Sequence, residues 1–124
     1  MEFIKKFKNV FAYAAYEEAN WKKNLEGMTD YQPFTTFYSD LSIGEWYGMK
    51  GIKDTFKNVV KQWGKNYKYF TEFVLCLNHK SWEMYSRNNE EWCELYTNLY
   101  YKATEIAEKN FKGDELSYFY NIMD

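Results

Sequence analysis

Apolar side chains recur along most of this chain at the three- and four-residue spacing of an amphipathic helix. The first such segment covers residues 2–26, and its apolar stripe comprises Phe3, Phe7, Val10, Phe11, Ala14, Trp21 and Leu25. Gly27 follows, at a position where glycine commonly ends a helix. The pattern therefore predicts a helix over residues 2–26 and then a loop over residues 28–34, which holds the one proline of the chain.

The next stretch carries weaker signals. Residues 35–40 are ambiguous between helix and a short extended piece, because Thr-Thr-Phe-Tyr suits both. Ser42 and Glu45 have the spacing of a capping box, which predicts a short helix through Trp46 and Tyr47.

Glycines and asparagines are expected to separate the following helices. Gly48 and Gly51 are predicted to precede a helix whose inward face holds Ile52, Phe56, Val59 and Trp63. Gly64 is expected to end that helix, and Asn66 is expected to cap the next one.

Residues 67–87 form the most apolar segment. One face is predicted to hold Phe70, Phe73, Val74, Leu77 and Met84, and a second face holds Leu75 and Trp82. A helix that is apolar on two sides is usually the central one of a bundle.

After a break at Asn88 and Asn89, the pattern predicts a helix over residues 89–111 and a last short helix with Leu116 and Phe119. The inward residues of the longer helix are predicted to be Trp92, Leu95, Leu99, Ala103 and Ile106. No sustained alternating run, internal repeat or linker occurs. The fold class predicted is all-α, a single-domain compact bundle of five to six helices over residues 1–124.

Composition excludes several functional classes for this protein. With 124 residues, one proline and a net charge of −2, the chain is long enough for a packed core. It is neither a basic nucleic-acid coat nor a strongly acidic mimic of DNA. The lysines within residues 1–11 interrupt any apolar run, so we expect no signal peptide and no membrane span. Two cysteines within helical patterns suggest reduced thiols, and a cytoplasmic protein is expected.

Aromatic residues make up 23% of the chain, which is more than the core of a domain this small needs. The excess rings are expected to thicken the packing or to lie at the surface, where amphipathic rings bind partners at low entropic cost.

Candidate chemistry is sparse. His79 is expected to point to solvent, and Cys76, three residues before it, lies on a helix that supplies no oxyanion hole. Cys93 would need the fold to bring it to His79. No Glu-x-x-His pair and no phosphate-binding glycine loop occurs. The sequence predicts no catalytic, metal or cofactor residues, and therefore no enzyme.

Two charged stripes and several tyrosines are the candidate binding residues. An acidic stripe with a tyrosine among it is predicted opposite the buried face of the helix over residues 89–111, comprising Glu90, Glu94, Tyr101, Glu105 and Glu108. Tyr13 and Tyr16 are expected on an outward face of the first helix. Such a surface would dock on a basic partner, although a charged stripe is more commonly a solvated face without a partner.

The alternative is an anion-binding stripe. Lysines recur at helical spacing about a third of a turn from the apolar face of their helix, at Lys50, Lys53, Lys57 and Lys61. They would meet a phosphate backbone or an acidic protein.

Several long segments resemble a known family. These are FTTFYSDLSIGEWYG, GIKDTFKNVVKQW, NYKYFTEFVLCLNHKSWEMY and NFKGDELSYFYNIMD, within residues 34–124. Together they are similar to small proteins of phages, prophages and conjugative elements of gut and oral bacteria. That family has no assigned activity, so the resemblance implies a mobile, phage-borne setting and no site residues.

Small phage proteins without catalytic motifs commonly act by stoichiometric binding, often to host defence proteins. The leading hypothesis is therefore an inhibitor of a bacterial defence enzyme, a CRISPR–Cas effector above all, with the acidic stripe and tyrosines in a basic groove. Three other hypotheses remain: a nucleic-acid accessory protein that uses the lysine stripe, a sponge for a nucleotide signal, and an enzyme. The pattern does not predict an oligomeric state.

Overall fold

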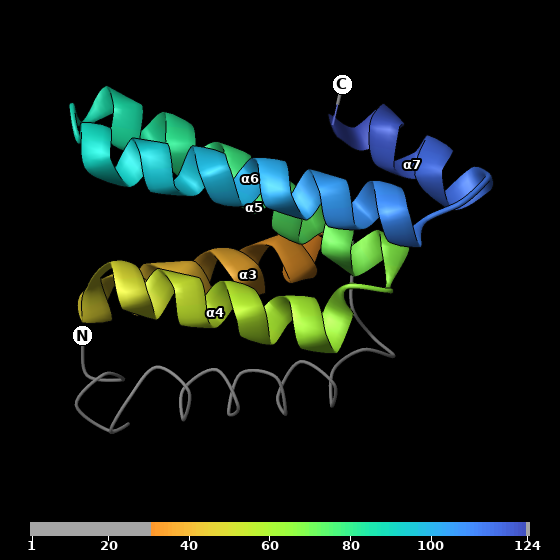
Figure 1. The fold of residues 1–124 in the computed structure, drawn as a ribbon, viewed down its shortest axis with the longest axis horizontal. Coiled ribbons are helices and arrows are strands. Elements are labelled where there is room, and N and C mark those ends of the chain that lie inside the picture. The colour runs from red at the N-terminus through yellow and green to blue at the C-terminus, as the bar shows by residue number, and fades with distance from the viewer. Residues whose placement is uncertain (1–30, 124) are drawn as a thin grey trace. The chain divides into compact units, whose positions relative to one another are not determined.

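The structure, a computed structural model, describes residues 31–123. The predicted helix over residues 2–26, with Tyr13 and Tyr16, lies outside the described residues. The described part contains α3 (Tyr31–Gly44), the 3-10 helix η2 (Glu45–Tyr47), α4 (Gly48–Trp63), α5 (Tyr67–Ser86), α6 (Glu90–Asn110) and α7 (Asp114–Met123) (Figure 1).

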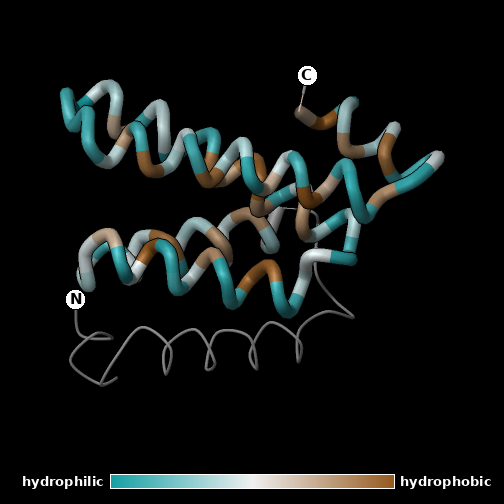
Figure 2. The backbone as a smooth tube through the Cα atoms, viewed as in Figure 1, coloured by the Kyte–Doolittle hydropathy of each residue, from teal (hydrophilic) through white to brown (hydrophobic). Residues whose placement is uncertain are grey.

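Over residues 31–123 the structure holds helices and no strand, which confirms the all-α prediction for this part of the chain. Hydrophobic positions recur between hydrophilic ones along the helices, as the sequence pattern requires (Figure 2). Contacts between Cα atoms divide the chain into two units, Met1–Asn58 and Val59–Asp124. A single domain over residues 1–124 stays a prediction.

Helix α3 corrects two predictions. Residues 31–34 are helical where a loop was expected, and residues 35–40 are helical where an extended piece was an option. Pro33 lies in the first turn, where its missing N–H would have no acceptor within the helix, so it does not interrupt α3. Phe37 and Leu41, four residues apart, are both buried, so burial of one face favours the helix.

The connection from α3 to α4 also differs from the prediction. Ser42 lies inside α3, and η2 begins without a side-chain cap, so the capping box is not formed. The expected short helix through Trp46 and Tyr47 is the single 3-10 turn of η2. Helix α4 begins at Gly48, which has a φ of 77° that suits glycine, and Gly51 lies inside the helix.

Gly51 is inside α4 because two backbones approach closely there. A Cβ atom added to Gly51 would overlap the carbonyl oxygen of Gly44, near the end of α3. A Cβ on Gly44 would in turn lie 2.9 Å from Oγ1 of Thr55, a hydroxyl that donates to the carbonyl of Gly51 at 2.9 Å. These glycines therefore serve the packing of α3 on α4 and do not end a helix.

The unit over residues 59–124 follows the predicted boundaries closely. Gly64 follows the end of α4, and the Asn66 side chain caps α5 by accepting from the N–H of Tyr69 at 3.1 Å. Asn89 caps α6 in the same way, with the N–H of Trp92 as donor at 3.2 Å. Asn88 has a φ of 58°, a left-handed conformation that asparagine tolerates, so the chain reverses between α5 and α6 in a short turn.

Buried rings connect three helices of this unit. Phe70 of α5 lies edge-on to Phe111, at the end of α6, with ring centroids 6.2 Å apart. Phe111 contacts Phe119 of α7 at the same separation, and all three side chains are almost fully buried. The predicted inward residues of α5 are buried as expected, namely Phe70, Phe73, Val74, Leu77 and Met84.

The inward face of α6 is rotated relative to the prediction. Leu99 and Ala103 are buried as expected, whereas Trp92, Leu95 and Ile106 are only half-buried. Tyr96 and Ala107, which were not expected to face inward, are completely buried, as is Ala103. A small residue at Ala107 allows close helix packing, and a large ring at Tyr96 fills the space that an aliphatic side chain was expected to fill.

Trp82 corrects the interpretation of α5 as apolar on two buried sides. Leu75 is half-buried, and Trp82 is 64% exposed. The second apolar side of α5 is therefore exposed to solvent at Trp82.

We predict that Gly51→Ala destabilises the protein by about 1–3 kcal/mol, because the methyl group would force α3 and α4 apart. In an unconstrained helix interior the same change would stabilise by about 1 kcal/mol, so the sign of the effect reports the close approach. Chemical denaturation would measure it, with Lys50→Ala as the control at an exposed position of α4. Equal or greater stability of Gly51→Ala would contradict the packing.

Candidate partner-binding face

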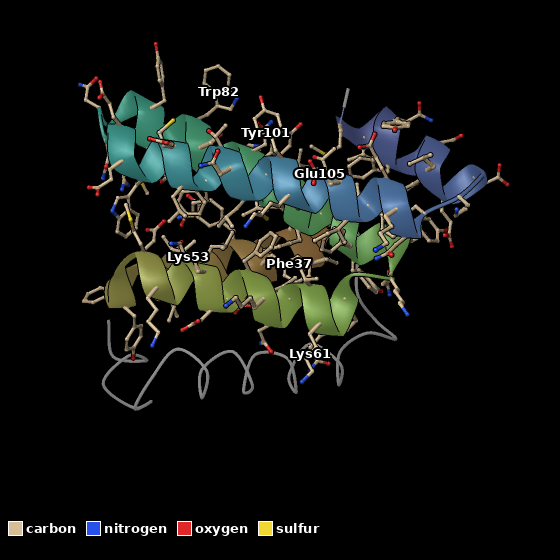
Figure 3. The ribbon with its side chains drawn as sticks, viewed as in Figure 1. Phe37, Lys53, Lys61, Trp82, Tyr101 and Glu105 are labelled. Atoms are coloured by element: carbon tan, nitrogen blue, oxygen red, sulfur yellow. The ribbon has the colours of Figure 1, made fainter. Side chains whose placement is uncertain are left out.

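Large exposed rings gather on the outer side of the α5–α6 pair. Trp82 and Tyr85 of α5 are 64% and 67% exposed, and Tyr101 of α6 is 60% exposed. The rings of Trp82 and Tyr85 contact each other edge to face, with centroids 5.8 Å apart. Trp82 and Tyr101 extend on the same side of the helix pair (Figure 3). Exposed rings are common singly, but a group of three on adjacent helices is typical of an interaction surface.

These rings line an open groove between α5 and α6. Its first hollow has a volume of about 370 Å³ and is lined by Asn78, Ser81, Trp82, Tyr85, Cys93, Thr97, Tyr100 and Tyr101. An adjoining hollow of about 300 Å³ shares three of these residues and adds Asn88, Asn89, Glu90, Glu94 and Asn98. We call the two together the α5–α6 groove. The short turn between the helices creates it, because it places the last turns of α5 beside the first turns of α6.

The predicted acidic stripe runs along the edge of this groove. Its members are all exposed, as predicted, at Glu90, Glu94, Tyr101, Glu105 and Glu108. At about 100° per residue, the four glutamates fall within about 40° of the direction of Tyr101. Glu90, Glu94 and Tyr101 line the groove, so the acidic stripe and the exposed rings form one continuous face.

The charge of the groove is negative. Among the residues that the structure describes, no lysine or arginine lines either hollow. The cations near the end of α5 are engaged within the helix, since Lys80 and Arg87 each lie 3.3 Å from a carboxylate oxygen of Glu83. A cationic ligand therefore meets carboxylates and rings in the groove, and a phosphate would meet repulsion.

The end of the stripe contacts α7. The Tyr120 hydroxyl donates to a carboxylate oxygen of Glu108 at 2.5 Å. This hydrogen bond, with desolvation and the negative charge of Glu108 as smaller causes, raises the pKa of Tyr120 above its ordinary value. Glu108 is thus bound within the protein, and the carboxylates that remain beside the groove are Glu90, Glu94 and Glu105.

The predicted lysine stripe is exposed along α4, at Lys50, Lys53, Lys57 and Lys61. A separate hollow of about 630 Å³ lies at the end of this helix. Lys61 and Lys65 line it, together with the amides of Gln62, Asn66 and Asn110. The Asn110 amide donates to the Gly64 carbonyl at 3.0 Å, which fixes the turn that borders the hollow. This is the second candidate site, suited to an anion.

The residues considered for chemistry differ in their burial. His79 is exposed, as predicted, and Cys76 is completely buried. Cys93 is half-buried and lines both hollows of the α5–α6 groove. Within residues 31–123, no group of three or more histidine, cysteine, aspartate or glutamate side chains is arranged to hold a metal ion. None of the helices in that range combines the length and apolarity that crossing a bilayer requires.

Sequence reasoning missed the groove residues on α5 and the buried Lys80. Trp82 was assigned to a buried side, and Tyr85 was not considered. Their spacing of three residues, on the side of α5 that also carries the polar Asn78 and Ser81, is the signal that marks an exposed aromatic edge. Lys80 is only 2% exposed, and its ammonium group pairs with Glu83 while its stem adds apolar surface.

Comparison of the chain with protein-family models, with curated proteins and with solved structures gives no match.

We predict that the contact between Tyr120 and Glu108 contributes stability that depends on pH. Because the pKa of Tyr120 is raised above 10.0, the contribution is complete below that pH and is lost as the pH rises through the raised pKa. Tyr120→Phe should therefore lower the melting temperature near neutral pH and change it less in strong alkali. A spectrophotometric titration of both proteins should give a difference curve with its midpoint above pH 10.0. A midpoint at or below this value would contradict the bond.

Proposed function

We propose that this protein acts by stoichiometric binding to another protein, through the α5–α6 groove and the acidic stripe beside it. The observation that carries the proposal is the gathering of Trp82, Tyr85 and Tyr101 around an open groove, whose lining among residues 31–123 includes carboxylates and no cation. Tryptophan and tyrosine are the residues most often found at the energetic centre of protein interfaces, because a rigid ring buries much area at little entropic cost.

The target that we propose is a bacterial defence protein, and in particular a CRISPR–Cas effector. Such effectors hold their nucleic acids in positively charged channels, which a rigid, locally acidic surface can occupy. Residues 83–124 hold nine acidic side chains against four basic ones, so the acidity is concentrated in the last third of the chain, which includes α6, although the net charge is only −2. The resemblance to phage-borne proteins supports this class of target, and the compartment that we propose for the action is the bacterial cytoplasm. Blocking by occupancy requires no catalysis.

Binding of nucleic acid through Lys50, Lys53, Lys57 and Lys61 is the second candidate. The observations that favour it are the exposure of all four lysines and the cationic hollow at Lys61 and Lys65. However, the exposed rings of the groove stand beside carboxylates, so bases stacked there would bring their phosphates against negative charge. The same repulsion disfavours a nucleotide signal as the occupant of the groove.

The proposal predicts which surface is needed in a cell. Expressed in a bacterium with an active CRISPR–Cas system, the protein should restore transformation by a targeted plasmid for at least one effector type. Glu90→Gln, Glu94→Gln and Glu105→Gln combined with Trp82→Ala should abolish this protection and leave the melting temperature nearly unchanged, because these side chains are exposed.

Two control variants make the result specific. Glu91→Gln removes an exposed carboxylate from the same helix, about 80° away from Tyr101, and should leave protection intact. Changing Lys50, Lys53, Lys57 and Lys61 to glutamine should also have little effect. Loss of protection in the lysine variant, with full protection in the groove variant, would replace this proposal by nucleic-acid binding.

A further inference from the structure

We propose that the α5–α6 groove receives an arginine side chain from a segment of the partner protein. This inference rests on the proposed function in taking a protein as the occupant, and it adds the chemistry by which the partner is recognised. Rings, carboxylates and amide groups converge on one groove that no cation lines among the described residues. A planar cation satisfies all three kinds of group at once.

The rings supply the first part of the recognition. Trp82 and Tyr85 meet edge to face and both remain mostly exposed, so the faces of their rings are open to a ligand. Tyr100 and Tyr101 line the same hollow, with centroids 5.5 Å apart. A guanidinium group stacks on the face of tryptophan or tyrosine through its planar, weakly hydrated cation.

The polar groups supply the second part. Glu90 and Glu94 line the adjoining hollow, and the side-chain carbonyls of Asn88 and Asn98 can accept hydrogen bonds there. A guanidinium group carries five N–H donors in a fixed fork, which suits several acceptors around one position. The Ser81 hydroxyl, in contrast, already donates to the carbonyl of Asn78 at 2.8 Å, so it remains available as an acceptor.

The occupant that we propose belongs to another protein and not to a second copy of this chain. Arg87 is the only arginine in the sequence, and its guanidinium donates to the Glu83 carboxylate at 3.3 Å. A lysine is a poorer occupant than an arginine, because its ammonium group is compact, strongly hydrated and unable to stack. The two adjoining hollows together extend beyond one side chain, which favours a segment of a protein over free arginine.

Cys93 gives a direct measure of occupancy. It is half-buried and lines both hollows, whereas Cys76, the other cysteine of the chain, is completely buried. A thiol reagent should therefore modify Cys93 first, and a ligand in the groove should slow that reaction.

The test uses the full chain and three short blocked peptides that differ only at one position, which holds arginine, lysine or the uncharged citrulline. Calorimetry gives the affinity, and the rate of Cys93 modification shows whether the peptide lies in the groove. We expect the arginine peptide to bind and to protect Cys93. The lysine peptide should bind about two- to fivefold more weakly, the size of one exposed cation–π contact, and the citrulline peptide should not bind.

Matched variants locate the interaction. Trp82→Ala and Tyr85→Ala should each weaken the arginine peptide by about two- to fivefold, whereas Trp46→Ala, at an exposed ring of η2, should not. Glu94→Gln should weaken it, and Glu91→Gln should not. Equal binding of the lysine peptide, insensitivity to Trp82→Ala and Tyr85→Ala, or no binding of the arginine peptide would each overturn the inference.

The result is separable from the proposed function. If the arginine peptide fails while plasmid protection still requires Trp82 and Glu94, the protein partner stands and the arginine does not. If the peptide binds with the expected selectivity and protects Cys93 while the cell shows no protection, the arginine site stands and the inhibitor proposal falls.

Discussion

The packing of α5 against α6 is the constraint on which the candidate face depends. Phe70, Phe111 and Phe119 form a buried row that joins these two helices to α7, and α6 packs alongside α5 after the short turn at Asn88. Burial of rings of this size is the largest stabilising contribution that single side chains can make. Because the inner faces are fixed in this way, the outer faces of both helices are fixed as well, and the groove lies between them.

The aromatic excess of the chain is divided between two roles within the described unit over residues 59–124. Phenylalanines fill the interior, together with Tyr96, whereas Trp82, Tyr85 and Tyr101 remain at the surface. Exposing rings of this size costs solvation free energy, which supports the protein partner that we propose for this hollow. In that proposal, the carboxylates beside the rings keep the surface of the free protein hydrated and favour a partner of positive charge.

The charged groups of the chain also follow two patterns. Lys80 and Arg87 pair with Glu83, and Glu108 binds Tyr120, so these groups act within the fold. Glu90 and Glu94 line the groove, Glu105 is exposed one helical turn after Tyr101, and the lysines of α4 lie on another helix. The acidic stripe is therefore partly structural at its Glu108 end and available for binding over the rest of its length.

The sequence by itself determined the all-α class over the described residues, the inward face of α5, the asparagine caps at Asn66 and Asn89, and the exposure of both charged stripes. These features follow from local rules, because helical periodicity and capping depend on residues within a few positions of one another. The binding roles of the stripes stay predictions. The local pattern did not predict Tyr96 as a core residue, Trp82 as an exposed one, or Gly51 inside a helix.

Only the tertiary structure decided those points, since each depends on residues distant in sequence. Gly51 is a packing residue because the backbone of Gly44 approaches it. A local sequence pattern cannot distinguish such a packing glycine from a glycine that ends a helix. The rotation of α6 toward Tyr96 places Cys93, Thr97 and Tyr100 beside α5 and so forms the groove. Aromatic side chains satisfy both an interior and an interface, so periodicity alone cannot assign them. Each ring is assigned to the core or to the surface only when the helices pack and a neighbouring helix covers it or leaves it exposed.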